Sequence, residues 1–149
     1  MSVYCTQSDV EPLVKFIDDD ASTDLFTSVL DNADAWVDAR LSSNSLSIWT
    51  SETRTVNNQS TTVILPEGKP VPLLLKTAAK YYAASDVILS LYNGEDLPTQ
   101  FDVYFQKAES MLEAYILQQK ELLATTELAD KNPIKHSKAK TYGQKRGRL

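Results

Sequence analysis

The chain has 149 residues, a hydrophobic content of 42% and a formal net charge of −5. This length fits one domain with a modest core, because a protein of about 150 residues buries about 68–70% of its unfolded surface. One cysteine and one histidine, Cys5 and His136, exclude a disulfide framework and a structural zinc site. The first residues lack the basic start of a signal peptide, and no run of about 18 apolar residues occurs. We therefore expect a protein that is made in the cytoplasm and has no membrane span.

Charge is divided unequally along the chain. Residues 1–130 hold 20 acidic and eight basic residues, a formal charge of −12, whereas residues 131–149 hold seven basic residues and no acidic one, a charge of +7. The second region also contains Pro133 and two glycines, which oppose regular structure. The sequence thus predicts a folded domain over residues 1–130 and an extended basic tail over residues 131–149.

Two helices are predicted in the first third of the chain. Ser8 and Glu11 have the spacing of a capping box, and the apolar residues that follow suit a short helix up to residue 17. Apolar residues then recur at intervals of three and four over residues 23–41, which is the period of one helix face. The aspartates between them are expected to face solvent, namely Asp31, Asp34 and Asp38.

Residues 42–70 interrupt the helical pattern. The segment is rich in Ser, Thr and Asn, with β-branched residues in alternation, and it predicts a β-hairpin that turns near Asn57-Asn58 and ends at Pro66. A stretch of this length without helix usually serves a function or stays mobile. Trp49 and Arg54 are candidates for a contact with another subunit, since large rings are enriched at interfaces. For Trp49, local packing under the hairpin is the alternative.

Two more helices are predicted after the hairpin. Pro72 suits the first turn of a helix that reaches Asn93-Gly94, where the glycine provides a stop. Thr99 and Asp102 then suit the start of a second helix of roughly twenty residues or more. The aromatic residues of these helices are expected to pack in the core, namely Tyr81, Tyr82, Tyr92, Tyr104, Phe105 and Tyr115. The predicted fold is mostly α: a small antiparallel bundle of about four helices, with a hairpin or irregular excursion between the second and third.

The sequence contains no recognisable arrangement of catalytic residues. A Ser or Cys nucleophile needs a base nearby, and the single imidazole, His136, lies in the predicted tail. Cys5 is expected to be an inert or partly buried thiol. The three aspartates at 18–20 lack the ligand spacing of a calcium loop, and no glycine-rich phosphate loop occurs. We therefore expect no enzyme, no cofactor and no metal site.

The basic tail has three interpretations: an arm that binds nucleic acid, a tether that docks on an acidic partner, or a solubilising end without a target. Basic side chains bind phosphate with a steep salt dependence. A domain of charge −12 repels a polyanion, however, and this favours a tail that reaches away from its own domain to a protein surface. The residues expected to bind the partner are Lys131, Lys135, Lys138, Lys140, Lys145, Arg146 and Arg148, with Tyr142 as an apolar anchor.

Several segments resemble the head-tail connector proteins of tailed viruses, which are also called adaptor or head-completion proteins. They are the short helix around Ser8, the helix that ends AWVDARL at residues 35–41, the proline-led VPLLLKTAAKYYAASD at residues 71–86 and KAESML at residues 107–112. The likeness covers roughly residues 5–120, and its motifs are amphipathic rather than chemical.

The resemblance implies a structural protein of the virion, located in the neck between capsid and tail. It implies a homo-oligomeric ring of about twelve copies that joins the portal protein to a stopper or tail-completion protein. Packaged DNA would pass through the lumen without sequence-specific binding. In this family the C-terminal segment commonly reaches the portal, which is the place of the basic tail here, and residues 42–70 correspond to a variable loop. The alternative is a small helical nucleic-acid-binding or regulatory protein that uses its basic tail.

Overall fold

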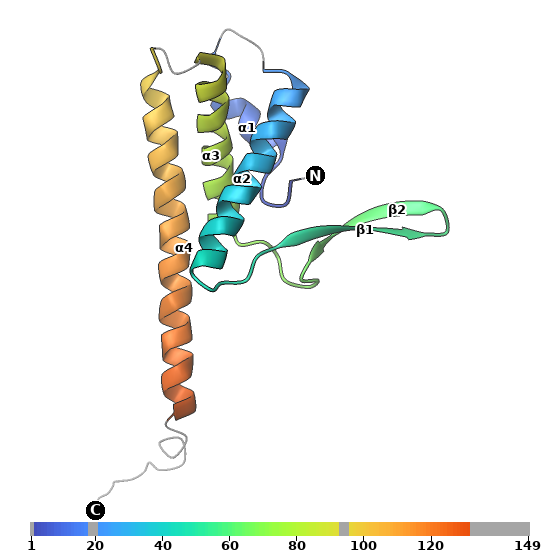
Figure 1. Ribbon diagram of the computed structural model, residues 1–149, viewed down its shortest axis with the longest axis vertical. Coiled ribbons are helices and arrows are strands. Elements are labelled where there is room, and N and C mark those ends of the chain that lie inside the picture. The colour runs from blue at the N-terminus through green and yellow to red at the C-terminus, as the bar shows by residue number, and fades with distance from the viewer. Residues whose placement is uncertain (1, 18–20, 93–95, 132–149) are drawn as a thin grey trace, which may run out of the picture. The chain divides into compact units, whose positions relative to one another are not determined.

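The computed structural model describes residues 2–17, 21–92 and 96–131 (Figure 1). The chain forms two compact units, Met1–Ile116 and Leu117–Leu149. The described elements, in chain order, are α1 (Gln7–Val10), the 3-10 turn η1 (Glu11–Leu13), α2 (Thr23–Ser43), β1 (Thr50–Val56), β2 (Gln59–Leu65), α3 (Leu73–Tyr92) and α4 (Thr99–Lys131). The prediction of a mostly α fold with an antiparallel hairpin between the second and third helices is confirmed. The boundary between the units lies inside α4, whereas the sequence-based division at residue 130 follows the charge.

Helix α1 begins two residues earlier than the sequence predicted. Its N-cap is Thr6, and the carboxylate of Asp9 accepts hydrogen bonds from the backbone N–H and the hydroxyl of Thr6, at 2.8 and 2.9 Å. The predicted capping box of Ser8 and Glu11 is therefore wrong. Glu11 accepts a hydrogen bond of 2.8 Å from the side chain of Gln7 instead, and the helix passes into the 3-10 turn at the following proline.

Helix α2 has a defined start and one buried face. The hydroxyl of Ser22 accepts a hydrogen bond of 3.1 Å from the N–H of Leu25, and Asp24 lies in the first turn, where a negative charge favours the helix dipole. The buried residues follow the predicted period of three and four: Phe26, Val29, Ala33, Val37 and Leu41.

Helix α3 presents small side chains to the core and packs against α2. Four alanines on α3 are fully buried: Ala78, Ala79, Ala83 and Ala84. Because alanine projects little, such a surface allows close approach of the neighbouring backbone. Pro72 lies just before the helix, and its carbonyl accepts hydrogen bonds of 3.1 Å from Leu75 and Lys76. The predicted stop at Asn93-Gly94 lies outside the described residues.

The part of α4 that belongs to the first unit completes the core of that unit. Its buried residues are Ala108, Leu112, Tyr115 and Ile116. Thr99 is the first helical residue rather than the cap, since the carbonyl of Pro98 accepts a hydrogen bond of 3.0 Å from Phe101. In Figure 1, α2, α3 and this part of α4 lie side by side with alternating directions.

The hairpin turns where predicted. Asn57 and Asn58 have positive φ angles of 54° and 65°, as a two-residue type I′ turn requires. Pairing runs without a bulge over seven residue pairs, from Val56 opposite Gln59 to Thr50 opposite Leu65. The peptide bond from Leu65 to Pro66 is cis. All of β1 is exposed, and Figure 1 shows the hairpin extending away from α2 and α3.

Candidate interaction surfaces

The base of the hairpin is fixed by Trp49, the residue before β1. Trp49 is 7% exposed; its indole N–H donates to the carbonyl oxygen of Lys69 at 3.1 Å, and its backbone N–H donates to the phenol of Tyr4 at 3.1 Å. Lys69 follows β2, so the indole closes the segment around the hairpin. The structure thus shows the local packing that the sequence left open for Trp49. Its ring has little surface left for another subunit.

Tyr4 connects this base to α2. Its phenol donates a hydrogen bond of 2.6 Å to Oδ1 of Asp38. Burial, aided by the hydrogen bond to Asp38, raises the pKa of the Tyr4 phenol. Burial also raises the pKa of Asp38, although the bond from Tyr4 opposes this effect. The phenol and the carboxyl group therefore both lie in a place that disfavours an added negative charge.

Asp34 fastens the N-terminal residues to the same helix. Its carboxylate accepts hydrogen bonds from the Ser2 hydroxyl at 2.8 Å, the Val3 N–H at 2.8 Å and the Tyr4 N–H at 3.3 Å. The expectation that Asp34 and Asp38 face solvent is therefore wrong: both are half-buried acceptors. Asp31 is exposed, as expected. The residues that neighbour Asp34 in the sequence do not indicate this role, because its hydrogen-bond partners lie about thirty residues away along the chain.

Arg54 lies on the exposed surface of the hairpin and makes ion pairs within it. Its Nε contacts Glu52 Oε2 at 2.5 Å, and its Nη1 contacts Glu67. The Arg54 side chain is 46% exposed. These two carboxylates raise the pKa of the guanidinium, with Glu52 the larger cause. Arg54 thus remains accessible to a partner, but its charge is already balanced by its neighbours.

The predicted docking residues lie at or beyond the end of α4. Lys131 is the last residue of that helix. The other seven lie outside the described residues: Lys135, Lys138, Lys140, Tyr142, Lys145, Arg146 and Arg148. The described part of the second unit has three leucines with 50–61% exposure, Leu117, Leu122 and Leu123. These leucines are five and one residues apart, so they point in different directions around the helix and form no single apolar face.

A polar and aromatic cluster joins α2, α3 and α4 within the first unit. The indole of Trp36 stacks on Tyr82 at 4.4 Å between ring centroids, and the Arg40 guanidinium lies 5.9 Å from the Trp36 ring. Arg40 Nη1 also contacts Glu109 Oε2 at 2.7 Å.

The aromatic residues of α3 and α4 differ in burial. Burial is deepest for Tyr115, at 7% exposure, whereas Phe105 is 38% exposed. The expectation of aromatic core packing is therefore confirmed for Tyr115 and wrong for Phe105, whereas Tyr81, Tyr82, Tyr92 and Tyr104 are half-buried.

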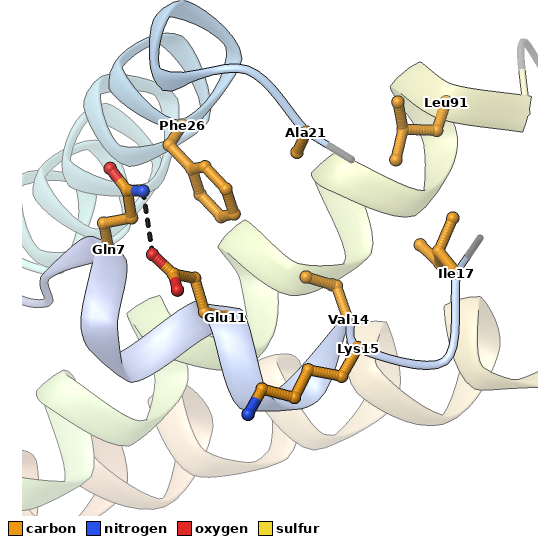
Figure 2. A pocket seen from close by; sticks show the side chains of 8 residues that line it. All are labelled: Gln7, Glu11, Val14, Lys15, Ile17, Ala21, Phe26 and Leu91. Carbon is orange, nitrogen blue, oxygen red and sulfur yellow. Dashed lines mark hydrogen bonds between the residues drawn. The ribbon is translucent and has the colours of Figure 1, made fainter. Parts of the chain in front are cut away.

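A cavity of about 350 Å³ opens between α1, α2 and the end of α3 (Figure 2). Five of the described residues that line it are apolar, namely Val14, Ile17, Ala21, Phe26 and Leu91. Gln7 and Glu11, which are hydrogen-bonded to each other, and Lys15 also line it (Figure 2). Polar and apolar side chains thus share the cavity wall, and none of the described residues that line it is Ser, Cys or His.

Cys5 is buried, and burial raises the pKa of its thiol to about 12. The thiol is therefore protonated at neutral pH, in agreement with the expected unreactive cysteine. Among the residues that the structure describes, no group of three or more His, Cys, Asp and Glu side chains is placed to hold a metal ion.

Comparison of the chain with protein-family models, with curated proteins and with solved structures finds no match. Within the described ranges, no helix combines the length and the apolar character that crossing a bilayer requires.

Proposed function

We propose that this chain is a structural virion protein: a head-tail adaptor that forms a ring beneath the portal and joins it to the stopper or tail, with packaged DNA passing through the lumen. The observation that carries the proposal is the order of elements. A short helix and α2 precede a hairpin, and α3 and a long α4 follow it and lead into the basic tail. This order is the one implied by the resemblance to head-tail connector proteins.

The distribution of charge supports the same role. An acidic domain lining a lumen lets DNA pass, because like charges prevent stable contacts with phosphate. A basic tail suits an acidic docking surface on the portal. In a ring, each docking event after the first is effectively intramolecular, so many weak tail contacts act together.

The exposed hairpin also supports assembly with other chains. It offers a two-stranded ribbon whose first strand is exposed over its whole length. A monomer would leave this ribbon in water, whereas a ring provides neighbouring chains that can cover it.

Removal of the tail tests the proposal. A chain truncated after Asp130 loses all seven basic residues of the tail, and we expect it to keep its helical circular dichroism but to lose binding to the portal protein in a pull-down. The matched control is a full-length variant in which those seven residues are Gln, which keeps the tail length and removes its charge. Undiminished portal binding by both variants would reject the docking arm.

The seven positive charges also favour a second candidate, a nucleic-acid-binding protein that uses the tail. Measuring the affinity for nonspecific DNA at two salt concentrations separates the two functions. Nucleic-acid binding by the tail predicts tight association at low salt that weakens steeply, because counterions are released from the phosphates. The adaptor predicts weak binding by the free chain at both concentrations.

A further inference from the structure

The hairpin has two outer edges whose backbone groups lack a strand partner. Within the described residues, the sheet consists of β1 and β2 alone. In a hairpin with a two-residue turn, the pair that closes the turn is hydrogen-bonded, and hydrogen-bonded pairs then alternate along the strands. Val56 and Gln59 close this turn. The outward-pointing backbone groups therefore belong to Ser51, Thr53 and Thr55 on β1 and to Ser60, Thr62 and Ile64 on β2.

The two edges are protected unequally. Natural proteins guard exposed edges with charges, prolines or bulges, because unpaired backbone groups accept strands from other chains. The pairing of β1 and β2 contains no bulge. β1 carries Glu52 and Arg54, whereas none of the seven residues of β2 is charged or a proline. β2 thus offers an unguarded edge, and the hairpin alone is at most marginally stable in water.

The charges of the hairpin favour another copy of the same chain as the added strand. The strands carry one acid and one base, and the Arg54 guanidinium is paired with Glu52 and Glu67. The hairpin therefore has no net charge to attract a charged peptide and little to repel a second hairpin. A partner for β2 must bring a free strand edge of similar length, and among the described residues the matching free edge is that of β1, also seven residues long.

We propose that the β2 edge of one copy pairs with the β1 edge of the next, so that successive hairpins form one continuous antiparallel sheet. This inference rests on the proposed ring. Head-to-tail pairing uses both free edges, and closure of the ring leaves none exposed. With the register of the hairpin repeated, Thr62 of one copy lies opposite Thr53 of the next. The Arg54 side chains of successive copies are then separated by two strand spacings, about 10 Å.

Mixed disulfides test the direction of pairing. In full-length protein with Cys5→Ala, single-cysteine variants Thr53→Cys and Thr62→Cys are mixed at high concentration under mild oxidation. We expect the mixed dimer to exceed either self-linked dimer. The matched control mixes Thr62→Cys with Ser28→Cys, which lies exposed on α2. Self-linking of Thr62→Cys above the mixed product overturns the head-to-tail pairing in favour of a two-fold contact. A mixed product no greater than that of the control overturns strand pairing altogether.

A proline on the outer edge tests the hydrogen bonds directly. Thr62→Pro removes an outward N–H without removing a hydrogen bond inside the hairpin, and Thr62→Ala is its control. We expect self-association measured by sedimentation to weaken by about tenfold or more for the proline variant and to be unchanged for the alanine variant. Equal association of both variants overturns the proposal. Portal binding by the tail is measured separately. If the proline variant associates normally but portal binding depends on the tail, the chain is an adaptor that assembles without hairpin pairing. If portal binding is also absent, the proposed adaptor function fails.

Discussion

The phenol of Tyr4 donates a hydrogen bond of 2.6 Å to Asp38 and accepts one of 3.1 Å from the backbone N–H of Trp49. One hydroxyl therefore joins the N-terminal segment, α2 and the residue that leads into β1. Tyr4 is 1% exposed, so neither partner has water as a ready substitute for this hydroxyl. The placement of the hairpin on the helices depends on this buried group.

Replacing Tyr4 by Phe is expected to destabilise the fold. The change leaves the buried N–H of Trp49 without its acceptor, and an unsatisfied buried donor costs about 1–3 kcal/mol. The free energy of unfolding in urea measures the loss. Tyr115→Phe is the control, since the Tyr115 phenol makes no hydrogen bond to the described residues. We expect its effect to stay within about 0.5 kcal/mol. Equal losses in the two variants would contradict the assigned role of the Tyr4 hydroxyl.

The raised pKa of Asp38 leads us to expect that this group stabilises the fold more at low pH than at neutral pH. Burial raises its pKa in the folded state above the usual 3.8, so the folded state binds this proton more tightly than the unfolded state. The contribution of Asp38 to stability is therefore least favourable above its folded-state pKa and improves as the pH falls from that pKa toward 3.8. Asp38→Asn keeps an acceptor for Tyr4 and removes the titration.

Urea unfolding of the wild type and Asp38→Asn between about pH 3.5 and 7 tests this sign. The free energy of the wild type minus that of the variant should increase as the pH falls. Asp31→Asn, on the exposed side of the same helix, controls for the loss of one negative charge. A difference that decreases toward low pH would contradict this sign. It would show that the hydrogen bond from Tyr4, which lowers the pKa of Asp38, outweighs burial, which raises it.

Two leucines near the start of α3 form a matched pair. Leu75 is fully buried and Leu73 is 77% exposed. Leu75→Ala is expected to lower the free energy of unfolding by about 2–5 kcal/mol, because it removes buried methyl groups and leaves a cavity in the core. Leu73→Ala on the same helix turn should change it by less than about 0.5 kcal/mol. Thermal or urea unfolding compares the two, and a similar loss in both would contradict the placement of α3.

The ion pair between Arg40 and Glu109 connects α2 to α4 within the first unit. Their side chains are 29% and 32% exposed, so solvent screens the attraction only in part. A double-mutant cycle of Arg40→Met and Glu109→Gln should give a coupling energy of about 0.2–1 kcal/mol, which decreases with added salt. The same cycle with Glu113, which lies 3.9 Å from Arg40 and is 71% exposed, should give almost none. Equal coupling to both glutamates would contradict this geometry.

The sequence predicted those parts of the fold that depend on neighbours in the chain. The period of apolar residues located α2, α3 and α4, and Asn57-Asn58 located the turn, because both signals act over a few residues. The roles of Asp34 and Asp38 were not predictable in this way. Their partners belong to the N-terminal segment, and only the folded chain brings these residues together. For Trp49, the sequence left both a subunit contact and local packing open. It could not decide between them, because the residue that accepts its indole hydrogen bond, Lys69, lies twenty residues further along the chain.

The indole bond between Trp49 and Lys69 has a mechanical consequence. The two connectors of the hairpin are joined at its root, and Tyr4 links that root to Asp38 on α2. A load applied at the turn therefore reaches α2 in part through these three hydrogen bonds, and the apolar residues at the hairpin root that pack on the core share it. Tilting of the ribbon would thus be felt in the interior of the subunit.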